Sequence, residues 1–325
     1  MRRAEVSVVS AAVAAALVVS ALVGASQNVV QPATSQPQAT RSVAMTFDDL
    51  PATRGDLAAM QETTAKLLRT LIAERVPAIG FVNESKLSLW NEIEPRTALL
   101  EAWLSVGFEL GNHTYSHVAI DRVPVETYTA DVIKGETVTR RLLEARGRRL
   151  RYFRHTQLRT GPTAEYKAAL DAFLAQRGYR VAPVTVDNND FVFADVYGRA
   201  RARGDRARMA RVAEAYVPYM ESVFTHFENV SRAFLGYEVR QVLLLHANEL
   251  NADYLDDLIG MLRRRGYRFV DLDTALDDPA YTLPEAQAAR GLSWLHRWML
   301  AKGLPMQAEP AEPAFIRELF EQPRE

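Results

Sequence analysis

Apolar and polar positions recur along the chain with two different periods from residue 42 onward. Short, nearly continuous apolar runs, which are typical of buried strands, occur at 42–47, 78–82, 108–111, 151–153, 181–186, 241–246 and 267–272. Longer amphipathic stretches, which predict helices, lie between them at 57–75, 96–105, 125–145, 164–178 and 252–266. This alternation predicts an α/β fold with a parallel sheet under covering helices, either a barrel or an open doubly wound sheet.

The first 25 residues have a different pattern, which predicts a secretory signal peptide. Two arginines precede a run of Ala, Val and Leu, and small residues lead up to a cleavage site near Ala25. The apolar run is also nearly long enough to span a bilayer, so an uncleaved N-terminal membrane anchor is the alternative. We therefore expect an exported protein, periplasmic or secreted.

The remaining chain divides by composition into a leader, a main domain and a tail. Residues 26–41 are rich in Gln, Ser, Pro and Thr, which predicts a flexible leader. The strand–helix alternation defines a main domain at 42–284, with a mainly helical insertion at 191–238. Residues 285–325 are predicted to form a C-terminal helical extension that packs back on the body.

Composition excludes several classes of function. The formal net charge of −1 gives no electrostatic basis for binding nucleic acid or an acidic membrane surface. The chain has no cysteine, which excludes disulfides, thiolate catalysis and cysteine-ligated metal sites, and leaves His and carboxylates as the strong metal ligands. No glycine-rich phosphate-binding motif follows the first predicted strand, which counts against the open sheets that bind nucleotides.

Residues with catalytic or metal-binding chemistry follow five of the predicted strands. In chain order they are Asp48 and Asp49, then His113 and His117, then Arg154, then Asp187 and Asp190, and finally His246. In barrels the chemistry is placed where strands end and loops begin. Two adjacent aspartates would repel each other without a nearby cation. Two histidines four residues apart would share one face of a helix and could chelate one ion. Together the five strand ends predict a hydrolytic metal site with open positions for water and substrate.

This ordered set resembles the motifs of the polysaccharide deacetylase family (carbohydrate esterase family 4, the NodB-homology domain) over roughly residues 43–276. The sequences "TFDD", "HTYSH", "FRH", "DNNDF" and "LLLH" match its five motifs in order. The resemblance implies a distorted (β/α)7 barrel and one divalent metal ion, for which zinc is the best candidate. It also implies metal ligands at Asp49, His113 and His117, a general base at Asp48, an arginine at Arg154 that holds the base, and a general acid at His246.

The resemblance predicts a metal-dependent hydrolase that removes acetyl groups from an N- or O-acetylated oligo- or polysaccharide. His246 would be charged through pairing with Asp187 or Asp190, between which the sequence does not choose. Tyr115 and Asn248 are candidate substrate contacts because they lie beside the second and fifth motifs. No protein partner is evident.

Three departures from the family motifs affect the expected groove wall. Leu50 and Pro51 stand where the family usually has Gly after the first motif, Thr156 stands where it has Pro, and Phe191 stands where it has Trp. None of them removes a ligand, acid or base. The altered motifs and the insertion leave one alternative, a metal-dependent amidase acting on a small non-sugar amide. The other alternative is an inactive carbohydrate-binding relative, which would be marked by loss of a ligand, base or acid.

Overall fold

The computed structural model describes residues 41–323, which contain seven strands in one sheet. They are β1 (Ser42–Leu50), β2 (Ala78–Val82), β3 (Glu109–Asn112), β4 (Tyr152–Phe153), β5 (Arg180–Val181), β6 (Gln241–His246) and β7 (Arg268–Val270). Six of them run in the order β5-β4-β3-β2-β1-β6, and β7 pairs with the start of β1. Every pair is parallel, which confirms the sheet predicted from the sequence.

The segment after β5 joins the two ends of this strand order. The backbone N–H of Ala182 donates to the carbonyl oxygen of Phe153 in β4, which continues the β4–β5 pairing at one end of the order. A few residues later Val186 forms a bridge with Leu243 of β6, at the other end. The predicted strand at 181–186 is therefore not one regular strand, because its start and its end pair with different neighbours. This closure gives a distorted barrel and confirms the predicted fold class.

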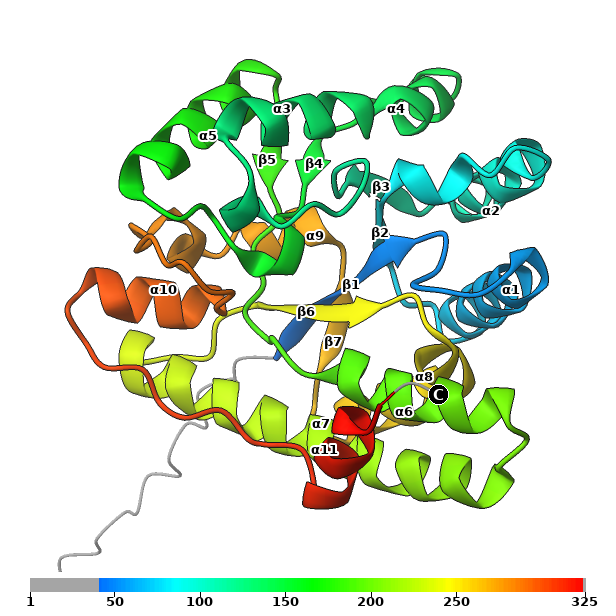
Figure 1. Ribbon diagram of the computed structural model, residues 1–325. Coiled ribbons are helices and arrows are strands. Elements are labelled where there is room, and N and C mark those ends of the chain that lie inside the picture. Colours follow the sequence, from blue (N-terminus) through cyan, green and yellow to red (C-terminus); the bar gives the residue numbers. More distant parts are fainter. Residues whose placement is uncertain (1–40, 324–325) are drawn as a thin grey trace, which may run out of the picture. The chain divides into compact units, whose positions relative to one another are not determined.

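Helices surround the curled sheet (Figure 1). In chain order they are α1 (Leu57–Ala73), α2 (Ile93–Ser105), α3 (Val125–Lys134), α4 (Thr137–Glu144), α5 (Ala164–Gln176), α6 (Asp190–Ala202), α7 (Arg206–Leu235), α8 (Glu249–Arg264), α9 (Leu272–Leu276), α10 (Trp294–Ala301) and α11 (Ala314–Glu321). Short 3-10 turns occur at Glu84–Leu87, Ile120–Arg122, Thr156–Leu158 and Pro279–Thr282. None of the helices within residues 41–323 combines the length and the apolar character that a membrane span requires.

The single helix predicted at 125–145 is wrong, because the chain breaks between α3 and α4. Gly135 packs so closely on the backbone of Thr114 that a Cβ there would collide with it. The buried carboxylate of Glu84 then accepts hydrogen bonds from the N–H groups of Val138 (2.9 Å) and Thr139 (2.7 Å), at the start of α4. A carboxylate at a helix N-terminus satisfies donors that have no partner inside the helix.

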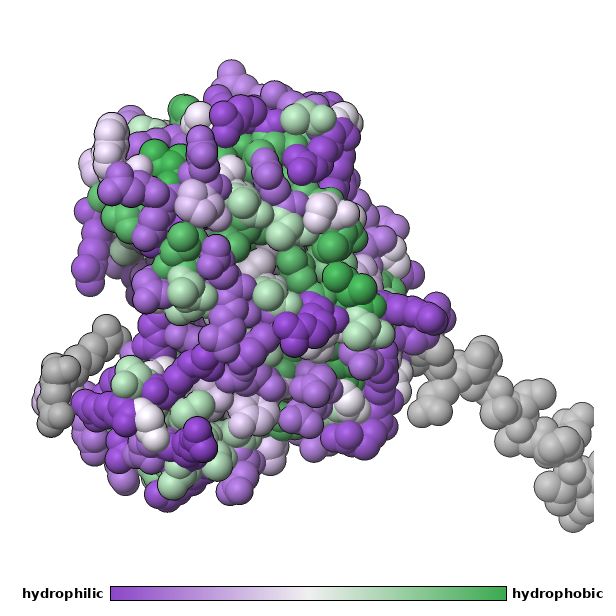
Figure 2. Space-filling model, turned by 90° about the vertical axis from the view of Figure 1, so that its right-hand side faces the viewer, coloured by the Kyte–Doolittle hydropathy of each residue, from purple (hydrophilic) through white to green (hydrophobic). Residues whose placement is uncertain are grey.

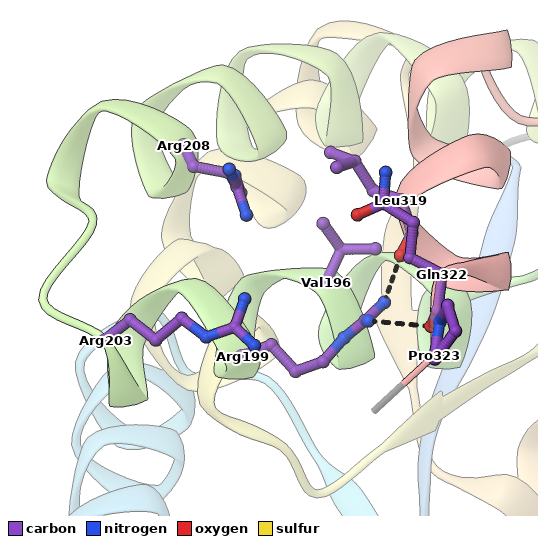
Figure 3. Close-up of a pocket in the computed structure, with 7 residues that line it drawn as sticks. All are labelled: Val196, Arg199, Arg203, Arg208, Leu319, Gln322 and Pro323. Atoms are coloured by element: carbon purple, nitrogen blue, oxygen red, sulfur yellow. Dashed lines mark hydrogen bonds between the residues drawn. The ribbon is translucent and has the colours of Figure 1, made fainter. Parts of the chain in front are cut away.

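The predicted insertion and extension meet each other on the outside of the barrel. The range 191–238 is occupied almost entirely by α6 and α7, and 285–323 contains α10 and α11. Helix α11 packs on α6, where Arg199 donates hydrogen bonds to the carbonyl oxygens of Leu319 and Gln322 (Figure 3). The predicted signal peptide and nearly all of the predicted leader lie outside the described residues.

Strand β1 pairs with β2, β6 and β7 and is almost fully buried. Phe47 packs on Trp103 of α2 with ring centroids 5.6 Å apart, which fixes the end of the strand against the core. This buried strand therefore presents Asp48 and Asp49 from a fixed position.

The face that carries α1 and α2 shows hydrophilic residues mixed with hydrophobic ones (Figure 2). Trp90, beside α2 on the chain, is 86% exposed.

Candidate metal centre and active site

Asp48 and Asp49 are turned apart at the end of β1. Asp48 continues the parallel pairing of β1 with β6, in register with His246. Asp49 adopts a left-handed backbone conformation with φ of 73°, and the strand register shifts at this point. A non-glycine residue in this region is uncommon and often marks a functional constraint. The two carboxylates can therefore take different partners.

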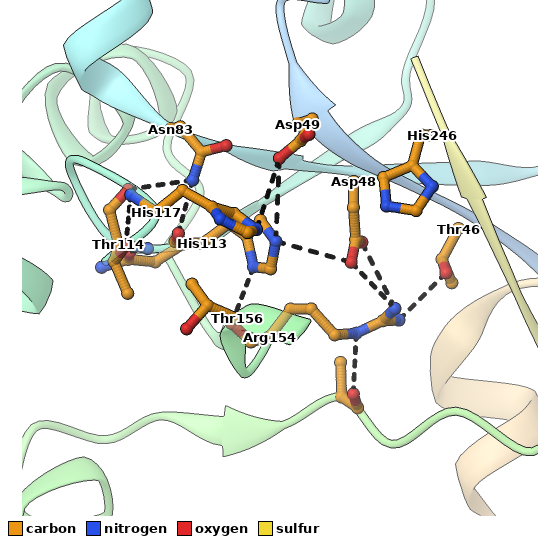
Figure 4. Close-up of polar contacts among 12 residues, drawn as sticks. Thr46, Asp48, Asp49, Asn83, His113, Thr114, His117, Arg154, Thr156 and His246 are labelled. Carbon is orange, nitrogen blue, oxygen red and sulfur yellow. Dashed lines mark hydrogen bonds and ion pairs between the residues drawn. The ribbon is translucent and has the colours of Figure 1, made fainter. Parts of the chain in front are cut away.

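The Asp49 carboxylate faces the two histidines that follow β3 (Figure 4). Its Oδ1 lies 3.9 Å from His113 Nε2 and 3.8 Å from His117 Nε2. The ligand atoms of these three residues all lie within 4.8 Å of one another. Within residues 41–323 no other group of three His or acidic side chains is close enough to hold a metal ion.

The two histidines are not on a helix, so the predicted helical geometry is wrong. The chain from His113 to His117 forms a turn in which Thr114 (φ 66°) and His117 (φ 56°) are left-handed. This turn still brings the two ring centroids to 4.9 Å. His113 Nδ1–H donates to the carbonyl oxygen of Arg154 over 2.9 Å, which leaves Nε2 with its lone pair toward Asp49.

These residues fit a divalent metal ion by their chemistry. Asp49 Oδ1 is buried and has no hydrogen-bond partner, although Lys86 Nζ lies 3.6 Å away. Buried acceptors of this kind are costly unless something compensates them. Burial lowers the pKa of both His113 and His117, so their rings are neutral, as metal ligation requires.

The buried Arg154 guanidinium contacts the Asp48 carboxylate. Its Nη1 lies 3.3 Å and 3.4 Å from the two Asp48 oxygens, and both side chains are buried. The same guanidinium donates to Thr46 Oγ1 (2.9 Å) and to the carbonyl oxygen of Ala182 (2.9 Å), which fixes its orientation. Burial raises the pKa of Asp48 to about 6, even though the Arg154 charge opposes this rise.

His246 is paired with Asp190, which answers the question that the sequence left open. The ring Nδ1–H donates to Asp190 Oδ1 over 2.7 Å. Burial alone would lower the pKa of His246, but the Asp190 carboxylate raises it to about 10, so the ring is protonated at neutral pH. Asp187 lies in the pocket instead, where it accepts from the backbone N–H of Asn188, and burial raises its pKa to about 7.

These groups open into one cavity of about 530 Å³. The candidate residues that line it are Asp48, Asp49, His113, His117, Asp187 and His246. Sequence reasoning gave no role to several others in its lining: Thr53, Gln157, Leu158, Arg159, Asn188 and Gly291. Gln157 and Arg159 lie just after the third motif, and this position was a signal that they could line the site. Nothing in the sequence points to Gly291.

The two predicted substrate contacts lie elsewhere. Tyr115 is absent from the cavity lining: its hydroxyl donates to Ser88 Oγ over 3.0 Å, and Lys134 Nζ lies 3.7 Å from its ring centroid. Asn248 is buried and caps α8, where its side-chain oxygen accepts from the N–H of Asn251 over 2.8 Å. The structure therefore gives both residues local structural partners.

Comparisons with known proteins give one family match. The family model described as polysaccharide deacetylase matches residues 35–182. A search of curated proteins finds no match.

Several solved structures are similar to this chain. Peptidoglycan deacetylase PdaC from Bacillus subtilis is 20% identical, with 74% of this chain and 91% of that chain covered and a TM-score of 0.45. The Bc1960 peptidoglycan N-acetylglucosamine deacetylase is 22% identical, with 74% and 89% covered and a TM-score of 0.47. BA3943 from Bacillus anthracis, described as a CE4 family pseudoenzyme, is 15% identical, with 74% and 66% covered and a TM-score of 0.46.

Proposed function

We propose that this chain, whose residues 35–182 match the polysaccharide deacetylase family model, hydrolyses acetyl groups from an N- or O-acetylated carbohydrate. The observation that carries the proposal is the convergence of five separate strand ends on one cavity. A possible metal triad, a carboxylate held by a buried arginine and a carboxylate-paired histidine meet there. Each of these groups has a defined task in hydrolysis.

Asp49, His113 and His117 would hold one divalent ion, and we propose zinc because two imidazoles and a carboxylate are typical ligands of catalytic zinc. The chemistry that such an ion supplies is polarisation of a carbonyl group and a lowered pKa of bound water. The chain itself keeps both imidazoles neutral by burial and orients His113 through the Arg154 carbonyl oxygen.

Asp48 is the proposed general base. Its Oδ2 lies 3.6 Å from His113 Nε2, so the carboxylate stands beside the metal ligands without belonging to the triad. Asp48 would accept the proton of the water that attacks the acetyl carbon. Arg154 favours the carboxylate form and fixes its position, since its own guanidinium has partners on three sides.

His246 is the proposed general acid. Its Nδ1 is occupied by Asp190, which leaves Nε2 as the atom that can give a proton within the cavity. When the bond between the acetyl carbon and the sugar nitrogen or oxygen breaks, His246 Nε2 would protonate the leaving atom. Its pKa of about 10 keeps the proton available at neutral pH.

Acetate release tests this proposal. Purified protein should release acetate from N-acetylglucosamine oligomers or O-acetylated glycans, lose that activity with a chelator, and regain it with zinc. The matched control is Asp48→Asn, which should bind metal but release little acetate. Absence of acetate release from every acetylated glycan, with metal bound, would refute the assignment.

The same assay separates the two alternative functions. The residues that depart from the family motifs include Phe191, which lines the cavity, so small acetylated or cyclic amides belong in the substrate panel. Turnover of these amides without turnover of glycans would establish the amidase. Glycan binding without turnover of any substrate would establish the inactive binding protein.

We propose export as the location of this activity. The support is the arginine pair, apolar run and small residues of the first 25 positions. N-terminal sequencing of protein from the native host should find a start near residue 26. An intact Met1 in a cytoplasmic fraction would contradict export, and an intact Met1 in a membrane fraction would indicate the anchor.

A further inference from the structure

The C-terminal extension reaches the active-site cavity at Gly291. This residue lines the cavity together with Gln157, Leu158 and Arg159 of the loop after β4. The two segments touch directly, since a Cβ at Gly291 would collide with the carbonyl oxygen of Gln157. A residue more than 130 positions away in the sequence therefore supports one wall of the cavity. We call Gln157–Arg159 the loop wall.

Arg297 binds the loop wall from behind. Its side chain is fully buried. Nη2 donates to the carbonyl oxygen of Leu158 over 2.6 Å, and Nη1 donates to Thr160 Oγ1 over 3.0 Å. Nη1 also donates to the carbonyl oxygen of Ala286, 3.1 Å away, so one guanidinium joins the loop to the extension. A buried arginine with these carbonyl partners is far stiffer than a surface contact, because leaving the charge or the carbonyl groups unpaired is costly.

The extension is in turn fixed to the barrel on both sides of Gly291. Ser293 Oγ donates to the carbonyl oxygen of Thr185 over 2.8 Å, and the Trp294 N–H donates to that of Val184 over 2.7 Å. Gln287 Nε2 donates to the carbonyl oxygen of Gly161 over 2.6 Å, at the end of the loop. The loop wall therefore packs against an extension that is itself hydrogen-bonded to the barrel.

The loop wall needs such support because its backbone is unfavourable on its own. Gln157 and Leu158 both have positive φ, 55° and 51°, which non-glycine residues adopt only when their surroundings hold them there. The preceding Thr156 stands where the family motif has a rigid proline. Its hydroxyl donates to the carbonyl oxygen of Val118 over 3.0 Å. Hydrogen bonds from Thr156 and Arg297 thus hold this segment in place.

The side chains of the loop wall suit an oxygen-rich ligand. Gln157 offers an exposed amide, and Arg159 offers a guanidinium whose Nη1 pairs with Asp121. Arg159 itself lines the cavity, so its guanidinium stands beside the space that a ligand would occupy. Phe191, which also lines the cavity, is 45% exposed and offers an apolar surface. Hydrogen-bond donors with an apolar surface match the hydroxyl groups and the C–H face of a sugar ring.

We propose that Arg297 and Gly291 of the C-terminal extension position the loop wall, and that this wall binds the saccharide around the acetyl group. The proposal deepens the proposed function and rests on it for the identity of the ligand. It makes Arg297 a positioning residue, which acts through the backbone of Leu158 and does not touch the substrate.

The experiment compares Arg297→Gln, Arg297→Lys and Gly291→Ala in the full chain, with Gly260→Ala as the matched glycine control. Gly260 is a suitable control because an added Cβ there would meet only the tip of Arg264, at 3.5 Å. Backbone amide hydrogen exchange reports the loop wall directly, since the N–H groups of Leu158 and Arg159 donate within the turn. Binding of an N-acetylglucosamine tetramer is measured by calorimetry on an Asp48→Asn background, where turnover does not interfere.

We expect faster exchange at Leu158 and Arg159 in Arg297→Gln and Gly291→Ala, partial recovery in Arg297→Lys, and no change in Gly260→Ala. The tetramer should bind roughly tenfold more weakly in the first two variants, while zinc affinity stays unchanged. Unchanged exchange in folded variants would overturn the positioning role, whether or not the enzyme releases acetate. Faster exchange with unchanged tetramer binding, or a parent that does not bind the tetramer, would overturn the saccharide assignment. Failure of the proposed function would appear separately, as bound tetramer without acetate release when Asp48 is intact.

Discussion

Asp190 binds both the ring and the main chain of His246. Oδ1 accepts from Nδ1–H over 2.7 Å, and Oδ2 accepts from the backbone N–H of His246 over 2.9 Å. Asn251 Nδ2 donates to the same Oδ2 over 2.7 Å, so the carboxylate has little freedom to move. One side chain thereby sets the rotamer, the tautomer and the charge of the proposed acid.

The first prediction concerns the alkaline limit of activity. A general acid works only while protonated, so activity should fall as pH rises through the pKa of His246, about 10. Asp190→Asn removes the charge that raises this pKa and should move the falling limb of the pH–rate profile to lower pH. The stability that the pair contributes is fully present below the ordinary histidine pKa, about 6.5, and is lost as pH rises toward 10. An unshifted falling limb in Asp190→Asn would show that His246 is not the titrating acid.

The second prediction concerns the division of roles at the end of β1. Asp48→Asn should retain the metal and lose turnover by about 10²–10⁴-fold, the usual contribution of general-base catalysis. Asp49→Asn should weaken metal binding as well, since Asp49 belongs to the possible metal triad. Metal content and rate are measured on the same samples. Metal loss in Asp48→Asn together with retention in Asp49→Asn would mean that the roles are reversed.

The third prediction concerns Arg154. Replacing it with Met removes the positive charge that lowers the pKa of Asp48 against the effect of burial. The pKa of Asp48 should therefore rise above its value of about 6. The base must be ionised, and the rising limb of the pH–rate profile should therefore move to higher pH. Arg154→Lys, which retains the charge, is the control and should shift the limb less. Equal shifts in the two variants would assign the effect to geometry instead of charge.

The fourth prediction concerns metal and stability. An ion that binds only the folded chain should stabilise it by about 2.7 kcal/mol at a free concentration of 100 times Kd. Thermal unfolding with zinc and with a chelator measures this difference, which should disappear in His117→Ala. His226→Ala serves as the control, because His226 lies outside the cluster. Stabilisation by zinc that persists in His117→Ala would place the bound ion elsewhere.

Local sequence patterns predicted the strands and helices that are set by their own apolar residues. The strands at 78–82 and 241–246 have the predicted bounds. Local patterns failed where contacts with distant residues set the ends of a helix. The helix predicted at 125–145 is divided because Gly135 packs on Thr114 and Glu84 caps the start of α4. The family resemblance predicted the distorted barrel, and the structure confirms it.

The site was predictable to the extent that parallel strands place their carboxyl ends together. The residues after five predicted strands were expected to meet. Six of them line one cavity, and Arg154 and Asp190 contact two of these six. The left-handed turn that joins His113 to His117 was not predicted, because Thr and His rarely adopt positive φ and give no signal for it. The contribution of Arg297 was also missed, since its partners are backbone carbonyl oxygens, which no side-chain pattern reveals.

Arg154 serves both halves of the site with different atoms. Its guanidinium restrains Asp48, while its carbonyl oxygen accepts from His113 Nδ1–H. A substitution at this position can erase the first contact but cannot erase the second, because every amino acid carries a carbonyl oxygen. One substitution here can therefore weaken the hold on the proposed base and leave the contact that orients the proposed metal ligand His113. The two halves of the proposed site can thus vary separately, although one residue joins them.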